Sequence, residues 1–307
     1  MPASALQCPN LTVGRHGVSD LNLWDSKQKI RALLEEKGIQ LKKRFGQNFL
    51  LDPNHRRRIL SALELPAGAK VWEIGPGIGS LTHGLLEMTG DLTVFEIDHG
   101  LIRILKDLFG SSISIVEGDF LRTFRDTARN SSLPRRIIGN LPYSSGSVMI
   151  GSLVEEDLLP DVAVFTLQKE VADRMLAQPG GKDYSAFSLV CQLRNRVEKI
   201  CDVGGAAFFP PPQVVSSVVR LRRRPDAPEG PQQDYFTAVH DLFRSRRKTA
   251  ANNLKGGGLK SRYSWESMKN AAELSGLDLG RRGETFSRDE VLSFTRALSD
   301  FQSPEAS

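Results

Sequence analysis

The sequence is poor in cysteine and contains no long apolar run. Its three cysteines, Cys8, Cys191 and Cys201, are an odd number and no pair has the spacing of metal ligands, so we expect free thiols and no bound metal. No apolar stretch approaches the ~20 residues that cross a bilayer. The N-terminus lacks the basic start and apolar core of a secretory signal. These absences predict a cytoplasmic protein without a membrane partner.

Acidic residues are only slightly fewer than basic ones, 36 against 41, and the formal net charge is +5. The positive charge is concentrated in two blocks. Residues 42–58 contain six Lys or Arg and one acid, and residues 220–262 contain eleven basic and four acidic residues. Such blocks on a nearly neutral remainder indicate a polyanionic partner. Taken alone, they would fit a solvated surface equally well.

Apolar runs of strand length alternate with helical patterns from residue 71 onward. Strands are expected at 71–74, 92–96, 113–116, 136–138 and 162–167, and helices at 81–88 and 101–108. This alternation is typical of βαβ units, so we predict an α/β fold, Rossmann-like, with a mostly parallel twisted sheet. Right-handed crossovers then place a ligand site at the carboxyl ends of the strands.

The two ends of the chain lack this alternation. Residues 1–26 are expected to be a disordered tail, before an amphipathic helix that ends at Gly38. Arg224 to Pro231, rich in proline, glycine and charge, is expected to be a linker. Helices without further strands are then predicted at 235–243, 265–275 and 289–298. The predicted organisation is a tail, a large α/β domain over 27–224 and a small all-helical domain over 231–300.

A glycine-rich loop, Glu73-Ile74-Gly75-Pro76-Gly77-Ile78-Gly79, follows the first strand and opens a helix. Glycines let the backbone approach a ligand and adopt angles that other residues resist. A dinucleotide fingerprint would have its third glycine at position 80, which is Ser80, and the Gly-Lys-Ser/Thr of a P-loop is absent. By itself the loop could equally be a plain tight turn.

Two acids at the ends of later strands help to decide whether the glycine loop binds a ligand or is a plain turn. Glu96 lies 21 residues after Gly75, at the end of the second strand, where a carboxylate can accept both hydroxyls of a ribose. Asp119 follows the third strand, where a carboxylate could meet an adenine amino group. Either acid alone would more often be a turn residue or a helix cap. With Glu73 they make three acids in order at successive strands, which capping alone does not explain. The acid-Gly-x-Gly-x-Gly loop suits S-adenosylmethionine better than a dinucleotide, because this ligand carries a carboxylate where a dinucleotide carries pyrophosphate.

The fourth strand ends in Asn140-Leu141-Pro142-Tyr143, which could be an ordinary strand-terminating turn. The same residues suit methylation of an exocyclic amine, whose lone pair is delocalised into the ring. Hydrogen bonds from that amine to the Asn140 side-chain oxygen and the Leu141 carbonyl would pull the nitrogen toward a tetrahedral form. Pro142 stiffens the turn, and Tyr143 offers a face on which an extruded base can stack. Catalysis would then come from placement and polarisation, without a metal or a strong base.

At these residues the sequence resembles the ribosomal RNA adenine dimethyltransferases, a family that methylates two adjacent adenosines near the 3′ end of small-subunit rRNA. The resemblance extends from about Lys42 to Leu254, with a weaker continuation toward residue 298. It is carried by the glycine loop, by Asn140 to Tyr143, and by the segments 43–50 (KRFGQNFL), 167–171 (LQKEV), 209–212 (FPPP) and 246–249 (RRKT).

The resemblance implies roles at the matching positions. Cofactor-binding residues would be Asn48 and Leu50 as lid residues, Gly75 and Gly77 at the methionine part, Glu96 at the ribose, Asp119 at the adenine, and Asn140. The cofactor would be S-adenosylmethionine, and the partner small-subunit rRNA or a precursor of the small subunit. A phosphate-contacting surface is expected at Arg222, Arg223, Arg244, Arg246, Arg247 and Lys248, of which the last four are predicted to lie on a helix. We expect a monomer.

Three other functions remain open. The first is a relative that methylates one adenosine of large-subunit rRNA, although the Pro210-Pro211-Pro212 and Arg246-Arg247-Lys248-Thr249 segments suit small-subunit enzymes better. The second is a non-enzymatic RNA-associated protein, which the retained Asn140-to-Tyr143 segment disfavours. The third is a small-molecule methyltransferase, which would not need two basic blocks. The sequence departs from the family at Ser144-Ser145-Gly146, where Asn-Ile followed by Ser or Thr is usual.

Overall fold

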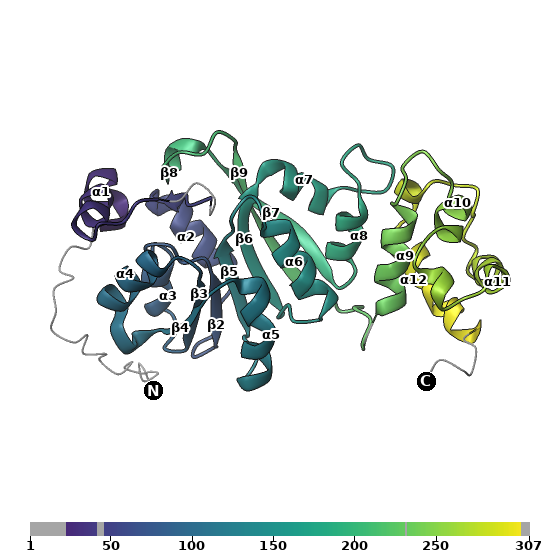
Figure 1. Ribbon diagram of the computed structural model, residues 1–307, viewed down its shortest axis with the longest axis horizontal. Coiled ribbons are helices and arrows are strands. Elements are labelled where there is room, and N and C mark those ends of the chain that lie inside the picture. Colours follow the sequence, from purple (N-terminus) through teal and green to yellow (C-terminus); the bar gives the residue numbers. More distant parts are fainter. Residues whose placement is uncertain (1–22, 42–45, 231, 302–307) are drawn as a thin grey trace, which may run out of the picture.

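A twisted sheet forms the centre of the protein and lies between two layers of helices (Figure 1). The computed structural model describes residues 23–41, 46–230 and 232–301. The strands of the sheet are β2 (Val71–Ile74), β3 (Leu92–Glu96), β4 (Ser114–Glu117), β5 (Arg136–Asn140), β6 (Val162–Gln168), β7 (Asn195–Val203) and β9 (Ser216–Arg223). Their order is β4-β3-β2-β5-β6-β9-β7. The first five run parallel, which confirms the predicted α/β fold with a mostly parallel sheet.

Burial explains why the central strands could be predicted. Every residue of β2 and β3 is buried, and so is all of β6 except Gln168. Strands covered on both faces need continuous apolar runs. One face is covered by α5 (Phe120–Asn130), α6 (Gly146–Glu155), α7 (Lys169–Leu176) and α8 (Ala186–Gln192). The other is covered by α2 (Pro53–Ala62), α3 (Thr82–Leu86) and α4 (His99–Phe109).

The last two strands of the sheet were not anticipated. β9 is antiparallel to β6 and β7, and Arg222 of β9 lies opposite Val162, the first residue of β6. β7 is an edge strand with mixed burial and four charged residues, so it lacks the apolar run that marks a buried strand. A small second sheet pairs β1 (Phe49–Leu50) with β8 (Phe208–Phe209).

The N-terminal part of the described chain packs against the glycine loop. Residues 1–22 of the expected disordered tail lie outside the described residues, but its end is ordered. Leu23–Asp25 form a 3-10 turn, followed by α1 (Lys27–Glu36). Trp24 is buried, its indole N–H donates to the Ile78 carbonyl at 2.9 Å, and its ring stacks on His83. A large apolar side chain therefore holds this end of the segment in place.

The C-terminal region consists of helices, as predicted, and Figure 1 shows them beyond α8 at one end of the sheet. They are α9 (Gln233–Leu242), α10 (Ala250–Lys255), α11 (Trp265–Ser275) and α12 (Arg288–Leu298). Tyr184 donates from its hydroxyl to the Phe286 carbonyl at 2.8 Å, and one hydrophobic cluster continues from the sheet into these helices.

The expected linker is fixed by two buried arginines. Arg194 donates to the carbonyls of Pro228 and Gly230, at 3.1 and 2.5 Å. Arg288 pairs with Asp226 at 3.0 Å. The linker residues that the structure describes are therefore held against the body of the protein by buried hydrogen bonds, which its composition did not indicate.

Candidate cofactor and catalytic site

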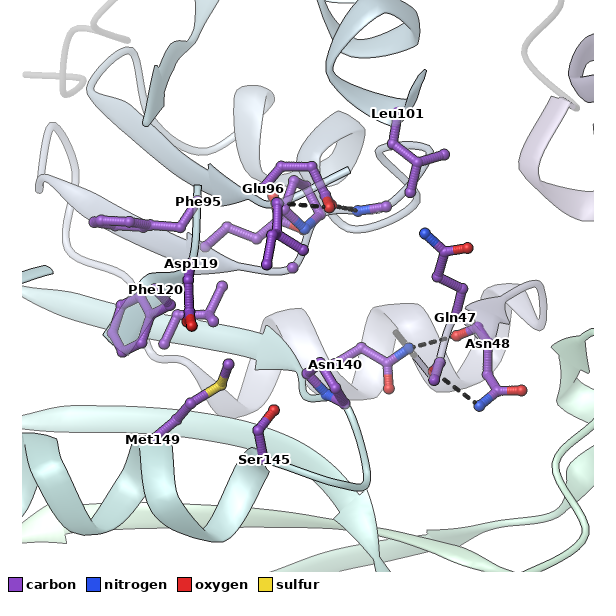
Figure 2. Close-up of a pocket in the computed structure, with 18 of the residues that line it drawn as sticks. Gln47, Asn48, Phe95, Glu96, Leu101, Asp119, Phe120, Asn140, Ser145 and Met149 are labelled. Carbon is purple, nitrogen blue, oxygen red and sulfur yellow. Dashed lines mark hydrogen bonds between the residues drawn. The ribbon is translucent and has the colours of Figure 1, made fainter. Parts of the chain in front are cut away.

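A cavity opens at the carboxyl ends of the parallel strands, where the alternation of strands and helices predicts it. Its walls come from the glycine loop after β2, residues 95–97 at the end of β3, residues 118–121 after β4, and Asn140 and Pro142 after β5. Residues 46–49 close the remaining side. Figure 2 shows Glu96 and Asp119 at one part of this cavity and Asn140, next to Asn48, at another. The structure therefore brings together six of the seven expected cofactor residues.

The glycine loop adopts the backbone that its composition requires. Gly75 and Gly77 have φ angles of 68° and 61°, in the left-handed region that favours glycine. A Cβ atom on Gly77 would lie 2.9 Å from the Phe49 ring, so this position also has no room for a side chain. At these two positions the loop presents its backbone to the cavity, whereas an ordinary turn would place side chains there.

Glu96 is a buried carboxylate held by the backbone. Its Oε1 accepts hydrogen bonds from the N–H groups of Ile97 and Asp98, both at 2.9 Å, and its Oε2 accepts one from Gly77 at 3.2 Å. Burial nevertheless raises the pKa of Glu96 to about 7. A carboxylate has about four lone-pair sites, so Oε2 retains capacity for a further donor in the cavity. This fixed acceptor matches the role expected for a ribose ligand.

Glu73 is a second buried acid in the cavity wall, at the end of β2. Its Oε2 accepts a hydrogen bond from the Thr82 hydroxyl at 2.7 Å. Burial, together with a smaller effect of the nearby Glu96 charge, raises the pKa of Glu73 to about 8. In the protein without a ligand, Glu73 is therefore largely protonated at neutral pH, which gives the cavity a neutral hydrogen-bonding group there.

Asp119 caps a helix and also lines the cavity, so its position is compatible with both alternatives that the sequence left open. It is the N-cap of α5 and accepts from the Leu121 N–H at 3.0 Å, and it also lines the cavity. Next to it, Phe120 packs edge-on against Phe95 with ring centroids 5.1 Å apart. Ile97 lines the cavity with 39% of its surface exposed. Apolar side chains beside a carboxylate suit the flat face and the amino edge of an adenine.

Asn140 has an orientation fixed by its own hydrogen bond. Its Nδ2 donates to the backbone carbonyl of Asn48 at 2.7 Å (Figure 2). Only the amide nitrogen can donate to a carbonyl, so the bond also determines where the amide oxygen lies. The Asn140 side-chain oxygen is then left as an acceptor at a residue that lines the cavity.

Hydrogen bonds to the neighbouring strands β6 and β9 hold the rest of the Asn140-to-Tyr143 segment. Leu141 is buried, and its N–H donates to the Thr166 carbonyl at 2.9 Å. Pro142 lines the cavity. The Tyr143 hydroxyl is 2.6 Å from that of Ser216, and burial raises the pKa of Tyr143. Tyr143 lines a second groove next to the cavity instead of the cavity itself.

The two expected lid residues lie differently. Asn48 lines the cavity, and its Nδ2 donates to the Gly46 carbonyl at 3.1 Å. Leu50 is fully buried in the hydrophobic cluster under α2 and is absent from the cavity wall. Successive side chains of a strand point to opposite faces, so Phe49 of β1 faces the cavity and Leu50 faces the core. Sequence reasoning therefore missed Phe49, along with Ile97 and Phe120.

The basic residues expected to contact RNA form two separate groups. Arg222 pairs with Glu64 at 2.5 Å and Arg223 with Asp157 at 2.9 Å. Because β9 runs antiparallel to β6, both arginines lie near the amino ends of the parallel strands, away from the cavity. Arg222 and Arg223 therefore do not form one surface with the residues around the cavity.

The second basic group follows α9. The helix expected to carry it ends at Leu242, so residues 244–248 form a turn before α10. Arg246 pairs with Glu284 at 2.8 Å, whereas Arg244, Arg247 and Lys248 are exposed and no ion pair is found for them in the described part of the chain. In Figure 1 this turn lies beyond the loop joining α7 and α8, toward the same upper side as β8.

The first basic block is only partly described. Lys42, Lys43 and Arg44 lie outside the described residues. Arg56 is structural, because it donates to the Leu51 carbonyl at 2.5 Å and pairs with Asp25.

Neither a metal cluster nor a membrane helix is found in the residues that can be described. Within them, no group of three His, Cys, Asp or Glu side chains could hold a metal ion. No helix there has both the length and the apolar composition for a bilayer.

Comparisons with known proteins agree with this geometry. The family model "Ribosomal RNA adenine dimethylase" matches residues 38–288. The chain is 38% identical to "Ribosomal RNA small subunit methyltransferase A" of Treponema denticola, over 88% of this chain and 93% of that protein. The protein of the same name from Listeria monocytogenes strain HCC23 is 36% identical, over 88% and 94% of the two chains.

Two solved structures share the fold. A dimethyladenosine transferase from Plasmodium falciparum has a TM-score of 0.67 at 24% identity, with 80% of this chain and 95% of that chain covered. The 23S rRNA methyltransferase ErmE has a TM-score of 0.60, also at 24% identity, with 82% and 100% covered. At this level of identity both structures support the fold alone.

Proposed function

The chain belongs to the ribosomal RNA adenine dimethylase family, and we propose that it transfers methyl groups from S-adenosylmethionine to two adjacent adenosines near the 3′ end of small-subunit rRNA. The two relatives reported above with 36–38% identity both carry the name of a small-subunit methyltransferase. Small-subunit rRNA is therefore the better supported substrate.

The orientation of Asn140 is the observation that carries this proposal. Its Nδ2 is occupied by the Asn48 carbonyl, so its oxygen is the atom available to accept from a substrate N–H. An adenine N6 donates one hydrogen to this oxygen and the other to the Leu141 carbonyl. Both bonds favour a tetrahedral nitrogen with its lone pair exposed. The nitrogen becomes acidic as it is alkylated, so its proton passes to solvent without a strong base.

The cavity residues fit S-adenosylmethionine, which supplies an electrophilic methyl group when bound. The backbone of Gly75 and Gly77 approaches its methionine part, and Glu96 accepts from its ribose. Asp119 accepts from its adenine amino group, while Ile97 and Phe120 contact the ring. Asn48 closes the lid. Leu50 supports that lid from the core, and no metal takes part.

RNA phosphates contact the exposed turn between α9 and α10. Arg244, Arg247 and Lys248 supply the positive charge, and Arg246 contributes once its pairing with Glu284 is exchanged. Arg222 and Arg223 lie away from the cavity, so in this arrangement they contact a more distant part of the particle. In this organisation residues 27–224 form the catalytic unit and residues 231–300 the RNA-contacting unit, in a cytoplasmic monomer.

Methyl transfer to ribosomal subunits tests the proposal. The purified protein is incubated with radiolabelled S-adenosylmethionine and small subunits that lack adenine dimethylation, or with large-subunit rRNA. Label in N6,N6-dimethyladenosine near the 3′ end of small-subunit rRNA is the expected result. Label only in large-subunit rRNA would indicate the other substrate, and no label in any RNA despite cofactor binding would contradict the enzymatic role.

A further inference from the structure

A segment at the start of the described chain packs behind the glycine loop. It comprises the 3-10 turn Leu23–Asp25 and α1 (Lys27–Glu36), and the region that matches the family model begins after it. None of these residues lines the cofactor cavity. The segment nevertheless shares one hydrophobic cluster with Phe49 and Leu101, which line the cavity, and with Ile78 of the glycine loop. It therefore supports the walls of the cavity from outside.

Trp24 fixes the end of the glycine loop through one hydrogen bond. Its indole N–H donates to the Ile78 carbonyl at 2.9 Å, and both residues are buried. Ile78 directly follows Gly77, whose N–H donates to the Glu96 carboxylate in the cavity wall. A buried carbonyl that loses its donor is costly, so without Trp24 the peptide group after Ile78 would turn toward another partner. The conformation of the loop next to Gly77 therefore depends on Trp24.

Trp24 also packs against the aromatic ring that fills the space beside Gly79. The φ angle of Gly79 is 83°, and a Cβ atom there would collide with the Phe109 ring. Trp24 stacks on Phe109, with ring centroids 6.2 Å apart and planes inclined by 10°, and on His83 with centroids 4.5 Å apart. A hydrogen bond and a ring contact thus act on two consecutive residues of the loop, Ile78 and Gly79.

Arg56 connects the same segment to the lid. Its guanidinium donates to the carbonyls of Trp24, at 3.1 Å, and of Leu51, at 2.5 Å, and it pairs with the Asp25 carboxylate. Leu51 directly follows β1, the strand that carries Phe49. The Arg56 side chain is 15% exposed, so these interactions are only weakly screened by solvent. One side chain therefore ties the N-terminal segment to the strand that presents Phe49 to the cavity.

We propose that residues 23–36 are a positioning element for the methionine part of S-adenosylmethionine, and that Trp24 is its main positioning residue. This assignment rests on the function proposed above, in which the backbone of Gly75 and Gly77 receives that part of the cofactor. Glycine has many accessible conformations, and both glycines have left-handed φ angles. Trp24 restricts that freedom without touching the ligand, so binding does not have to order the loop. The adenosine part, placed at Asp119, gains little from Trp24.

Two ligands that differ in the methionine part test this assignment. S-adenosylhomocysteine, the demethylated product, carries that part, whereas 5′-methylthioadenosine has a methyl group in its place on the same sulfur. Isothermal titration calorimetry gives both affinities for the full-length wild type and for Trp24→Phe, which keeps an aromatic ring but loses the N–H. The matched control is Tyr184→Phe. It also removes a hydrogen bond from a buried aromatic side chain to a backbone carbonyl, that of Phe286 in the C-terminal region.

Trp24→Phe should weaken binding of S-adenosylhomocysteine about tenfold, as the loss of one hydrogen bond would, and binding of 5′-methylthioadenosine by less than about twofold. Tyr184→Phe should leave both affinities within about twofold of the wild type, although it also lowers stability in urea unfolding. Arg56→Lys should show the same selective loss as Trp24→Phe, because one ammonium group does not reproduce the fork of a guanidinium. If Trp24→Phe does not fold, Arg56→Lys decides the question.

Three results would overturn the assignment while leaving the proposed function intact. One is an equal loss for both ligands in Trp24→Phe and Arg56→Lys, as general destabilisation would give. Another is unchanged binding of S-adenosylhomocysteine by the folded variants. The third is a wild type that binds both ligands equally well, because it would have no methionine site to position. If the wild type binds neither ligand, the proposed function itself is wrong, and the assignment fails with it.

Discussion

Replacing Glu96 with glutamine is expected to weaken binding of S-adenosylhomocysteine and to remove most of its pH dependence. The Glu96 carboxylate is held by three backbone N–H groups and aims its remaining acceptor capacity into the cavity. Hydrogen bonds to a charged group are worth about 1.5–3 kcal/mol, so the variant should bind about 10- to 100-fold more weakly at pH 8.

The pH dependence follows from the raised pKa of Glu96. Burial holds this pKa at about 7 in the protein without ligand, and a ribose hydroxyl requires the ionised form as its acceptor. About ten in eleven Glu96 side chains are ionised at pH 8, but only about one in eleven at pH 6. The wild type should therefore bind about tenfold more weakly at pH 6 than at pH 8. The variant should lack this change.

Isothermal titration calorimetry at pH 6, 7 and 8 gives the affinities of both proteins. The ratio of their dissociation constants isolates the effect of Glu96, because the nearby Glu73 titrates in both. This ratio should shrink about tenfold from pH 8 to pH 6. If the ratio is constant, or if Glu96→Gln binds as tightly as the wild type at pH 8, Glu96 is not the ribose ligand.

Three further predictions concern stability and RNA contact. The pKa of Glu73 is raised to about 8, so its contribution to the free energy of unfolding is present below about pH 4.5 and is lost as the pH rises through 8. In urea unfolding, Glu73→Gln should therefore be a few kcal/mol more stable than the wild type at pH 9 and almost equal to it at pH 4.5. An equal gain in stability at both pH values would refute this prediction. Trp24→Ala should lower stability by about 3 kcal/mol, because it removes a buried ring and the bond to Ile78, and a loss under 1 kcal/mol would show that the N-terminal segment is not anchored there. The double change Arg247→Ala with Lys248→Ala should lower the slope of log affinity for small subunits against log salt by about 2, and an unchanged slope would remove this turn from the RNA surface.

The central fold could be predicted because burial on both faces imposes a recognisable pattern. β2, β3 and β6 are buried along almost their whole length. The acids and the amide of the site lie at the carboxyl ends of parallel strands: Glu96 ends β3, Asn140 ends β5, and Asp119 follows β4 by two residues. Parallel strands bring their carboxyl ends to one edge, so Glu96, Asp119 and Asn140 meet although they are distant in sequence.

The features that were missed depend on contacts between distant segments. β7 and β9 are antiparallel strands near the edge with charged side chains, and their direction decides that Arg222 lies away from the cavity. Trp24 is buried only because α3 and α4 provide aromatic partners. Leu50 was expected as a lid residue from the resemblance alone, and its side chain lies in the core. A two-residue strand has too few alternations for the sequence to show which side chain faces the cavity.

The rate of methyl transfer by Asn140→Ala tests the central claim most directly. Single-turnover transfer from S-adenosylmethionine to unmethylated small subunits is measured for this variant and the wild type, and affinity for S-adenosylhomocysteine is measured in parallel. Losing a preorganised acceptor at the reacting amine should slow transfer about 100- to 1000-fold, while cofactor affinity falls less than about tenfold. Transfer within about threefold of the wild type would contradict the role of the Asn140 oxygen in holding the target amine.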